Sequence, residues 1–450
     1  MKKWLWVLSV LLVFSIAMAI SMWTDALPFL TGKQRTLLAF MRQNAAPNRP
    51  EANAFFDLLT IRHDVPRPKR VEVAMAYLAE IRDVTGDELP GKSAVLDRFE
   101  PRWFPGDDDP SLCGVREPGC LSKVRASIRK SRERMQRFED ILIAARDLRQ
   151  FDHYWDLSPA RIDFPVSLPR PSFHGLVVTD AALLFVDGQH DAALADVCND
   201  ARWWRRVRIG TNSLIFDALA GSYIADDARL FAEMLSELDV TTTLPPACIG
   251  TFDPISDAEL DLCNAARREF AMLEAVFDDA HAGRLDSKRS QRPWVSLATG
   301  RLSVSRDHAA ALSAPAYARL CFDVSRTAHE RRIPDLGPPH QVECGIVERV
   351  FDPIGCRFAE QALPQMDDYF YRLLDLDARM KLVSTALWLR RTGAMDGALL
   401  SERPEALRTS FHPMEWVPER HAIRARNQFT KWGDWWEIPI HAQSGQPTSR

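Results

Sequence analysis

Residues 180–238 read DAALLFVDGQHDAALADVCNDARWWRRVRIGTNSLIFDALAGSYIADDARLFAEMLSEL and carry the clearest supersecondary pattern of this 450-residue chain. Apolar residues recur at helical spacing in three segments, 180–186, 190–207 and 213–238. Gly188 separates the first two segments, and Gly210-Thr211-Asn212 separates the second from the third, which Ser213 caps. Short turns between amphipathic helices favour antiparallel packing. These residues therefore predict a helical hairpin.

The rest of the chain also favours helices. Helical periodicity predicts further helices over 32–46, 51–62, 69–86, 122–150, 256–283 and 357–392. Gly, Pro and Asp predict a long loop over 87–120, and four prolines make 155–172 an irregular connector; 284–302 and 331–343 also read as loops. Residues 429–440 are compatible either with a short strand or with the packing of Trp432, Trp435 and Trp436 onto the helices. The expected fold class is mainly α, with a small irregular C-terminal part.

Four regions follow from this pattern. We expect a signal-anchor segment, an N-terminal helical region with a long loop, a helical-hairpin core domain, and an irregular C-terminal tail, over residues 1–23, 24–120, 121–400 and 401–450 respectively. The 427 residues after the first segment are too many for one ordinary core, so two or three packed units are expected.

The N-terminal segment predicts export. From Trp4 to Trp23 the chain has no charged residue, and such a run of about 20 residues spans a hydrocarbon core of about 30 Å. Lys2 and Lys3 keep the N-terminus in the cytoplasm, so the remainder is translocated. Cleavage after Ala19 is the alternative. Because the apolar run continues past that residue, we favour a retained single-pass anchor in an inner membrane, with the main domain in the periplasm.

Composition excludes one class of partner. Apolar residues make up 46% of the chain and charged residues 26%, which are globular values. Without Lys2 and Lys3, 55 basic residues face 61 acidic ones, so the exported part is mildly acidic. Nucleic-acid binding requires a basic footprint, so no nucleic-acid partner is expected.

Eight cysteines in an exported chain predict disulfides, because the periplasm oxidises thiols. Eight cysteines allow 105 pairings, so sequence alone does not determine the connectivity. Proximity favours Cys113 with Cys120, Cys344 with Cys356, and Cys248 with Cys263, and leaves Cys198 and Cys321. The chain has no C-x-x-C pair, which disfavours a zinc site.

A short internal repeat accompanies the cysteines. Phe252-Asp253-Pro254-Ile255 recurs as Phe351-Asp352-Pro353-Ile354, with a cysteine before and after each copy. Asp is a good N-cap, and Pro is tolerated at the first helical position. The repeat therefore predicts two similar helix starts, with a duplicated helical unit as the alternative.

No catalytic motif stands out. The chain lacks H-E-x-x-H, G-x-S-x-G, P-loop and G-x-G-x-x-G patterns. Polar clusters at 107–109, 152–156 and 278–286 are better explained as a solvated loop, a cap or a helix end. We therefore expect no metal and no cofactor, and regard an enzyme as the less favoured class.

The run Trp203-Trp204-Arg205-Arg206 is different in kind. Neighbouring residues on a helix point about 100° apart, so both indoles cannot face one narrow stripe. The helix is then either deeply buried or presents one Trp to a groove. Because Trp and Arg are favoured interface anchors, these four residues are the candidate binding residues.

The basic residues of 122–137 allow a similar choice between a solvated face and a docking surface for an acidic partner. Together these features predict a membrane-anchored periplasmic binding, scaffold or inhibitor protein for another envelope protein. The alternative is an extracytoplasmic hydrolase whose site is assembled from distant segments.

Overall fold

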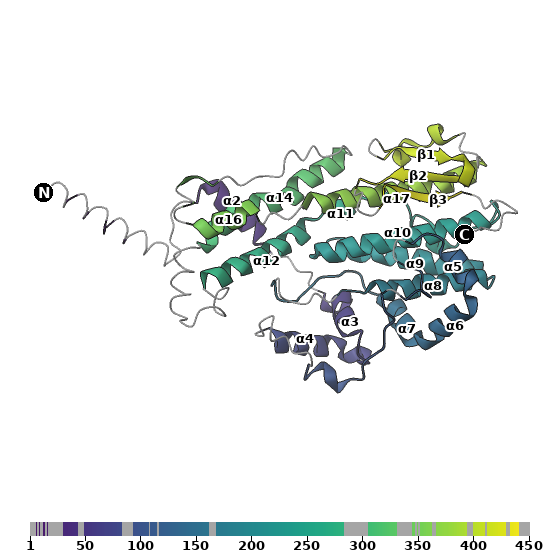
Figure 1. Ribbon diagram of the computed structural model, residues 1–450, viewed down its shortest axis with the longest axis horizontal. Helices are drawn as coiled ribbons and strands as arrows, with labels where there is room; N and C mark the ends of the chain where they lie inside the picture. Colours follow the sequence, from purple (N-terminus) through teal and green to yellow (C-terminus); the bar gives the residue numbers. More distant parts are fainter. Residues whose placement is uncertain are drawn as a thin grey trace.

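A computed structural model of the chain (Figure 1) describes residues 30–43, 49–82, 93–107, 109–114, 117–161, 168–282, 305–330, 344–345, 352–361, 366–393, 399–409, 412–428 and 433–440, together with residues 6, 9, 12, 13, 16, 346 and 349. Within these residues the protein is mainly helical, with one small sheet near the C-terminus. The expected fold class is confirmed at that level.

The predicted hairpin forms the centre of the molecule. It consists of α8 (Pro171–Val186), α9 (His190–Arg208) and α10 (Leu214–Glu237). Gly188 and Gly210 take positive φ angles of 80° and 71° at the two turns, a conformation that residues with a Cβ rarely adopt. The Ser213 hydroxyl accepts a hydrogen bond from the backbone N–H of Phe216 and caps α10.

Other helices cover this hairpin on two sides. α17 (Met366–Thr392) packs along α10, and the short helices α5 (Cys120–Ala126), α6 (Ile128–Arg137) and α7 (Glu139–Leu148) cover α8. The single helix expected over 122–150 is therefore wrong. The backbone leaves helical values at Ser127 and Phe138, and these breaks let three short helices follow the surface of α8.

A second group of helices lies toward the left of the view in Figure 1. It contains α2 (Gly32–Met41), α12 (Cys263–His281), α14 (Arg306–Glu330) and α16 (Pro353–Gln361). The sequence did not predict α14, which contains Pro315. The helices expected over 256–283 and 357–392 are each divided, because α11 (Asp257–Leu260) precedes α12 and α16 precedes α17.

Smaller elements complete the fold. α3 (Ala54–Thr60) and α4 (Arg70–Ile81) pack together beside the hairpin. Short 3-10 turns lie at Pro50–Ala52, Arg67–Lys69, Leu96–Arg98, Pro246–Cys248, Leu400–Glu402, Glu405–Leu407 and Pro418–Arg420. The loops expected over 284–302 and 331–343 lie outside the described residues.

The C-terminal part is more regular than expected. β1 (Met414–Val417), β2 (Ala422–Arg426) and β3 (Trp435–Pro439) form an antiparallel sheet in that order, packed on α10 and α17. Trp436 and Ile438 are buried while Trp435 is partly exposed, which is the period-two pattern of a half-buried strand. Of the two alternatives for 429–440, the strand forms at Trp435–Pro439, and the expected irregular tail is corrected to a sheet.

All eight cysteines are paired. Cys113 bonds to Cys120 and Cys344 to Cys356, as expected. The expected pairing of Cys248 with Cys263 is wrong, because Cys248 bonds to Cys198 and Cys263 bonds to Cys321. Helix packing is the reason: α9 places Cys198 beside the turn that holds Cys248, and α14 places Cys321 beside the start of α12.

The two copies of the repeat differ in structure. Asp352 caps α16 by accepting the backbone N–H of Gly355, as predicted. In the first copy, Ser256 caps α11 instead of Asp253. Only the second copy is therefore a helix start of the predicted kind.

The N-terminal segment is described at five positions only, residues 6, 9, 12, 13 and 16, all helical. The large apolar side chains among them, such as Trp6, are exposed. The rest of the expected anchor lies outside the described residues. Within the described part of the chain, no helix combines the length and the apolar character that crossing a membrane requires.

Candidate functional site

The structure places both indoles of the Trp203–Arg206 run in the core. Trp203 and Trp204 are each 1% exposed, with ring centroids 4.3 Å apart. The interpretation in which one indole lines a groove is therefore corrected, because α9 is covered by α8 on one side and α10 on another. A binding role for this run stays a prediction, without the exposed indole on which it depended.

The two arginines of the run make internal contacts. Arg205 donates to both carboxylate oxygens of Glu259, at 2.7 and 2.8 Å, and to the carbonyls of Thr251 and Asp253. It thereby holds the first copy of the repeat against α9. Arg206 is exposed and donates to the carbonyl of Arg149 at 2.6 Å.

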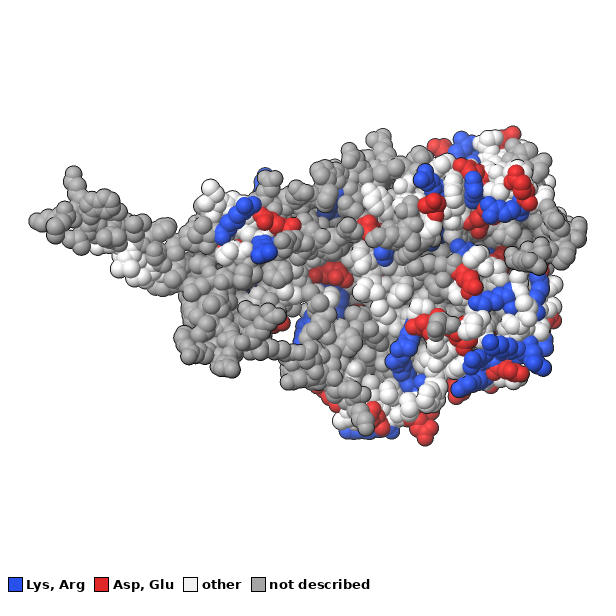
Figure 2. Space-filling model, in the orientation of Figure 1, with Lys and Arg blue, Asp and Glu red and all other residues white. Residues whose placement is uncertain are grey.

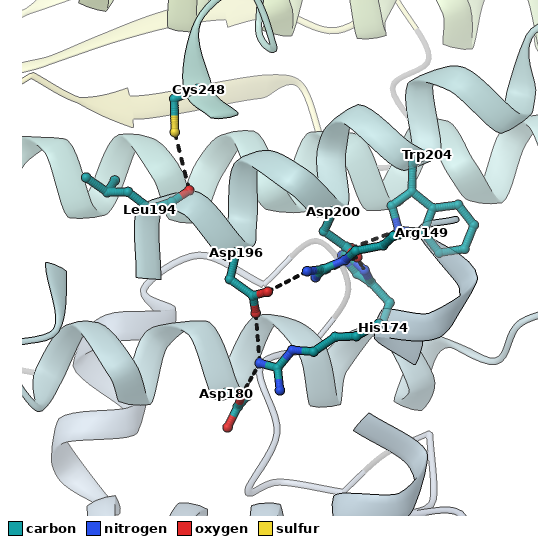
Figure 3. A network of polar contacts seen from close by, with 9 residues as sticks. Arg149, His174, Asp180, Leu194, Asp196, Asp200, Trp204 and Cys248 are labelled. Carbon is teal, nitrogen blue, oxygen red and sulfur yellow. Dashed lines mark hydrogen bonds and ion pairs between the residues drawn. The ribbon is translucent and has the colours of Figure 1, made fainter. Parts of the chain in front are cut away.

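Beside Trp204 the hairpin encloses a buried polar group, which we call the His174 cluster: His174 of α8, Asp200 of α9 and Asp227 of α10 (Figure 3 shows the part around His174 and Asp200). Their exposed fractions are 1%, 3% and 1%. His174 Nδ1 lies 3.5 Å from Asp200 Oδ2, and His174 Nε2 lies 3.8 Å from Asp227 Oδ1. Both distances exceed ordinary hydrogen-bond lengths.

Asp200 is well satisfied. Arg149 donates to its Oδ1 at 3.1 and 3.2 Å, and the Trp204 indole N–H donates to its Oδ2 at 2.9 Å (Figure 3). Burial by itself would raise the pKa of Asp200, but Arg149, His174 and Trp204 outweigh that effect and lower it. Asp200 is therefore a charged, fixed neighbour of the imidazole.

Asp227 is the opposite case. Neither of its carboxylate oxygens, and neither ring nitrogen of His174, has a hydrogen-bond partner among the described residues. Burial, with the nearby charges of Asp200 and Asp226, raises the pKa of Asp227 well above its usual value. An unsatisfied buried carboxylate is costly, so this position requires a ligand or a proton.

Sequence reasoning missed the His174 cluster because its members lie on three different helices. Asp227, for example, stands among the buried apolar residues Ile224, Leu230 and Phe231 of α10. A titratable residue within an apolar stripe is the signal that could have indicated the site.

One surface pocket adjoins the cluster. It has a volume of about 230 Å³ and is lined by Leu58, Leu59, Ile61, Arg62, Phe104, Leu168, Pro169, Arg170 and Phe173. The next residue after Phe173 is His174, whose ring stacks on Tyr223 at 4.4 Å. The Tyr223 hydroxyl donates to the carbonyl of Pro169, which lines the pocket, so Tyr223 connects the pocket with the cluster.

The pocket is cationic on an apolar floor. The Arg62 guanidinium lies 5.9 Å from the centre of the Phe104 ring. Burial and the neighbouring Arg170 lower the pKa of Arg62. Among the described residues, neither guanidinium forms an ion pair, and Asp107, the nearby acid, accepts the backbone N–H of Ser172 instead.

In the polar clusters noted in the sequence, acidic side chains form ion pairs with arginines outside each cluster. Asp109 binds Ser111 and Arg134, and Asp156 pairs with Arg268 at 3.1 Å. Asp278 pairs with Arg306. Asp108 and Asp286 lie outside the described residues. These contacts favour the structural roles that the sequence predicted for the clusters.

The basic residues of α5 and α6 form a mixed-charge face, seen as neighbouring blue and red atoms at the lower right of Figure 2. Lys123 pairs with Glu117, Arg125 with Glu237 and Arg132 with Asp187. These pairs favour the solvated face over the docking surface.

No family model, curated protein or solved structure matches this chain.

Proposed function

We propose that this chain is an exported binding protein, tethered to an inner membrane by its N-terminal apolar segment, that holds a segment of another envelope protein. The bound segment carries a carboxylate next to a bulky apolar side chain. The chain binds this segment in the surface pocket described above, which we call the Arg62–Arg170 pocket after its two arginines.

The location rests on two features. Four disulfides are compatible with an oxidising compartment outside the cytoplasm. The uncharged run from Trp4 to Trp23, behind Lys2 and Lys3, has the pattern of an anchor with its N-terminus in the cytoplasm.

The observation that carries the binding proposal is that Arg62 and Arg170 form no ion pair within the described part of the chain and lie beside apolar side chains. Arg recognises carboxylates through charge-assisted hydrogen bonds, and the partly exposed ring of Phe104 offers apolar contact area. Trp103, beside Phe104, is 79% exposed. Exposed Trp next to Arg is typical of interface anchors.

The size of the pocket favours a protein segment over a whole small molecule. Sites for drug-sized ligands usually enclose ~300–1,000 Å³, whereas this pocket measures about 230 Å³. One large side chain fits such a volume, with the rest of the partner outside it. The hydrolase alternative is less favoured, because none of the described lining residues is a nucleophile or a general base near neutral pH.

Short peptides test the proposal. Peptides that place Asp, Glu or a free chain end beside Leu or Phe are expected to bind the full chain. Changing the acid to its amide should weaken binding by about tenfold or more, since a charge-assisted hydrogen bond contributes ~1.5–3 kcal/mol. Fluorescence anisotropy measures these affinities.

The double variant Arg62→Gln/Arg170→Gln should no longer prefer the acidic peptide over its amide. The matched control, Arg129→Gln/Lys130→Gln at two exposed positions of α6, removes the same charge and should retain this preference. Equal peptide binding by both double variants contradicts the proposal. So does tighter binding of a free fatty acid than of any peptide, because the pocket would then serve a small amphiphile.

A further inference from the structure

Asp227 and His174 face each other across a gap inside the core of the hairpin. The imidazole nitrogen nearest Asp227 is 3.8 Å from its carboxylate, and no described residue donates to either Asp227 oxygen. A protonated imidazole between two carboxylates would form bonds of about 2.7–2.9 Å to both. The gap is instead close to the ~3.4 Å that separates neighbouring ligands around a four-coordinate ion with bonds of about 2.1 Å.

The net charge around the gap also favours a bound cation. The three carboxylates of Asp180, Asp196 and Asp200 bind the two guanidiniums of Arg146 and Arg149, which leaves one negative charge. An ionised Asp227 beside His174 adds a second. Arg146 and Arg149 bind the first three carboxylates and leave Asp227 alone. A dication at Asp227 would neutralise the group.

We propose that His174 Nε2 and the Asp227 carboxylate bind a first-row divalent metal ion, with Zn²⁺ or Mn²⁺ as the best-suited ions. The imidazole ligand disfavours Mg²⁺ and Ca²⁺, which prefer oxygen donors in larger number. All eight cysteines are in disulfides, so no thiolate competes for the ion.

Asp200 has a different role in this site. Its Oδ2 faces Nδ1 of His174 at 3.5 Å, while Arg149 and Trp204 hold it in place. A carboxylate on the far nitrogen of a ligating histidine sets the tautomer and the orientation of the ring. Asp200 is thus a positioning residue, whereas Asp227 and His174 are the ligands.

The site ties the three hairpin helices together from inside, since His174, Asp200 and Asp227 lie on α8, α9 and α10. It shares no residue with the Arg62–Arg170 pocket. The two proposals therefore succeed or fail separately.

The test is metal content and thermal stability of the untagged full chain. Protein purified from the envelope should retain about one Zn²⁺ or Mn²⁺ per chain by elemental mass spectrometry. After removal by a chelator, adding back Zn²⁺ or Mn²⁺ should raise the melting temperature by several degrees, because a ligand specific to the folded state stabilises it. Mg²⁺ and Ca²⁺ at the same concentration should not.

Three variants give a graded result. Asp227→Asn and His174→Gln should abolish both retention and stabilisation, and Asp200→Asn should weaken metal affinity by about tenfold to a hundredfold. His308→Gln is the matched control: His308 is buried against Asp352 at a hydrogen-bonded distance of 2.9 Å, and its loss should leave metal binding unchanged. Disulfide mapping and circular dichroism confirm that each variant folds.

Two outcomes overturn the proposal. One is metal that stays bound in Asp227→Asn and His174→Gln, which would place it elsewhere. The other is a metal-free wild-type chain that no added ion stabilises. A higher melting temperature of Asp227→Asn would then identify Asp227 as a buried acid in its neutral form.

Discussion

Trp203 and Trp204 show how two adjacent identical residues differ in energetic role. Both are 1% exposed. The Trp204 indole N–H donates to Asp200 at 2.9 Å, whereas the Trp203 indole nitrogen has no partner among the described residues. Only Trp204 therefore contributes a buried hydrogen bond to a charged acceptor.

Replacing each indole by phenylalanine separates these roles. Both changes remove buried volume and should lower the free energy of unfolding. Trp204→Phe should cost about 1.5–3 kcal/mol more than Trp203→Phe, because it also removes a hydrogen bond to a carboxylate. Urea unfolding with the disulfides intact measures the difference. Equal losses would show that the bond to Asp200 contributes nothing.

At the scale of elements, Glu233 joins two helices. Its carboxylate, on α10, accepts the backbone N–H groups of Gly119 at 2.7 Å and Leu121 at 3.1 Å, at the start of α5. These N–H groups have no partner within the helix, so the contact caps α5 from another element. Burial nevertheless raises the pKa of Glu233 despite the two hydrogen bonds.

This shift predicts a pH dependence. A raised pKa means that the folded state holds the proton more tightly than the unfolded state. The contribution of Glu233 to stability is therefore full below the ordinary carboxyl value of 4.5 and falls as pH rises toward the folded-state pKa. Glu233→Gln should lose less stability than the wild type between about pH 4 and pH 7, measured by urea unfolding at each pH.

Glu237→Gln, one turn further along α10, is the control for the loss of a carboxylate. Glu237 pairs with exposed Arg125 at the surface. If Glu233→Gln follows the wild-type pH profile unchanged, the carboxylate is not protonated preferentially in the folded state.

At the scale of the whole molecule, two disulfides join cysteines that are far apart in the sequence and so stabilise the fold more than a short-range disulfide does. Cys198–Cys248 and Cys263–Cys321 close loops of 50 and 58 residues. In the chain-entropy account each contributes about 4 kcal/mol, against about 2 kcal/mol for a short loop such as Cys113–Cys120. Stability should therefore depend on the compartment in which the chain folds.

Export and oxidation should go together. Full-length protein from the envelope is expected to give four disulfide-linked peptide pairs in mass spectrometry without reduction: 113–120, 198–248, 263–321 and 344–356. A chain that lacks residues 2–23 stays in the cytoplasm and should be reduced and less stable. Free thiols in most envelope molecules, or activity of a cytoplasm-specific reporter fused at Arg450, would contradict the proposed topology.

Local pattern determined much of this protein. Gly188, Gly210 and Ser213 act within a few residues, so the sequence alone predicted the hairpin. The pairings of Cys113 with Cys120 and Cys344 with Cys356 also followed from short separation. Each of these features depends on neighbours in the chain, and periodicity and spacing report on such neighbours.

Tertiary packing decided the rest. Whether an indole on α9 faces a groove or the core depends on α8 and α10, and both cover it. Cys198 and Cys321 meet their partners only because rigid helices place them there. The His174 cluster draws one residue from each of three helices, so its chemistry exists only after the hairpin has closed and has removed these side chains from water.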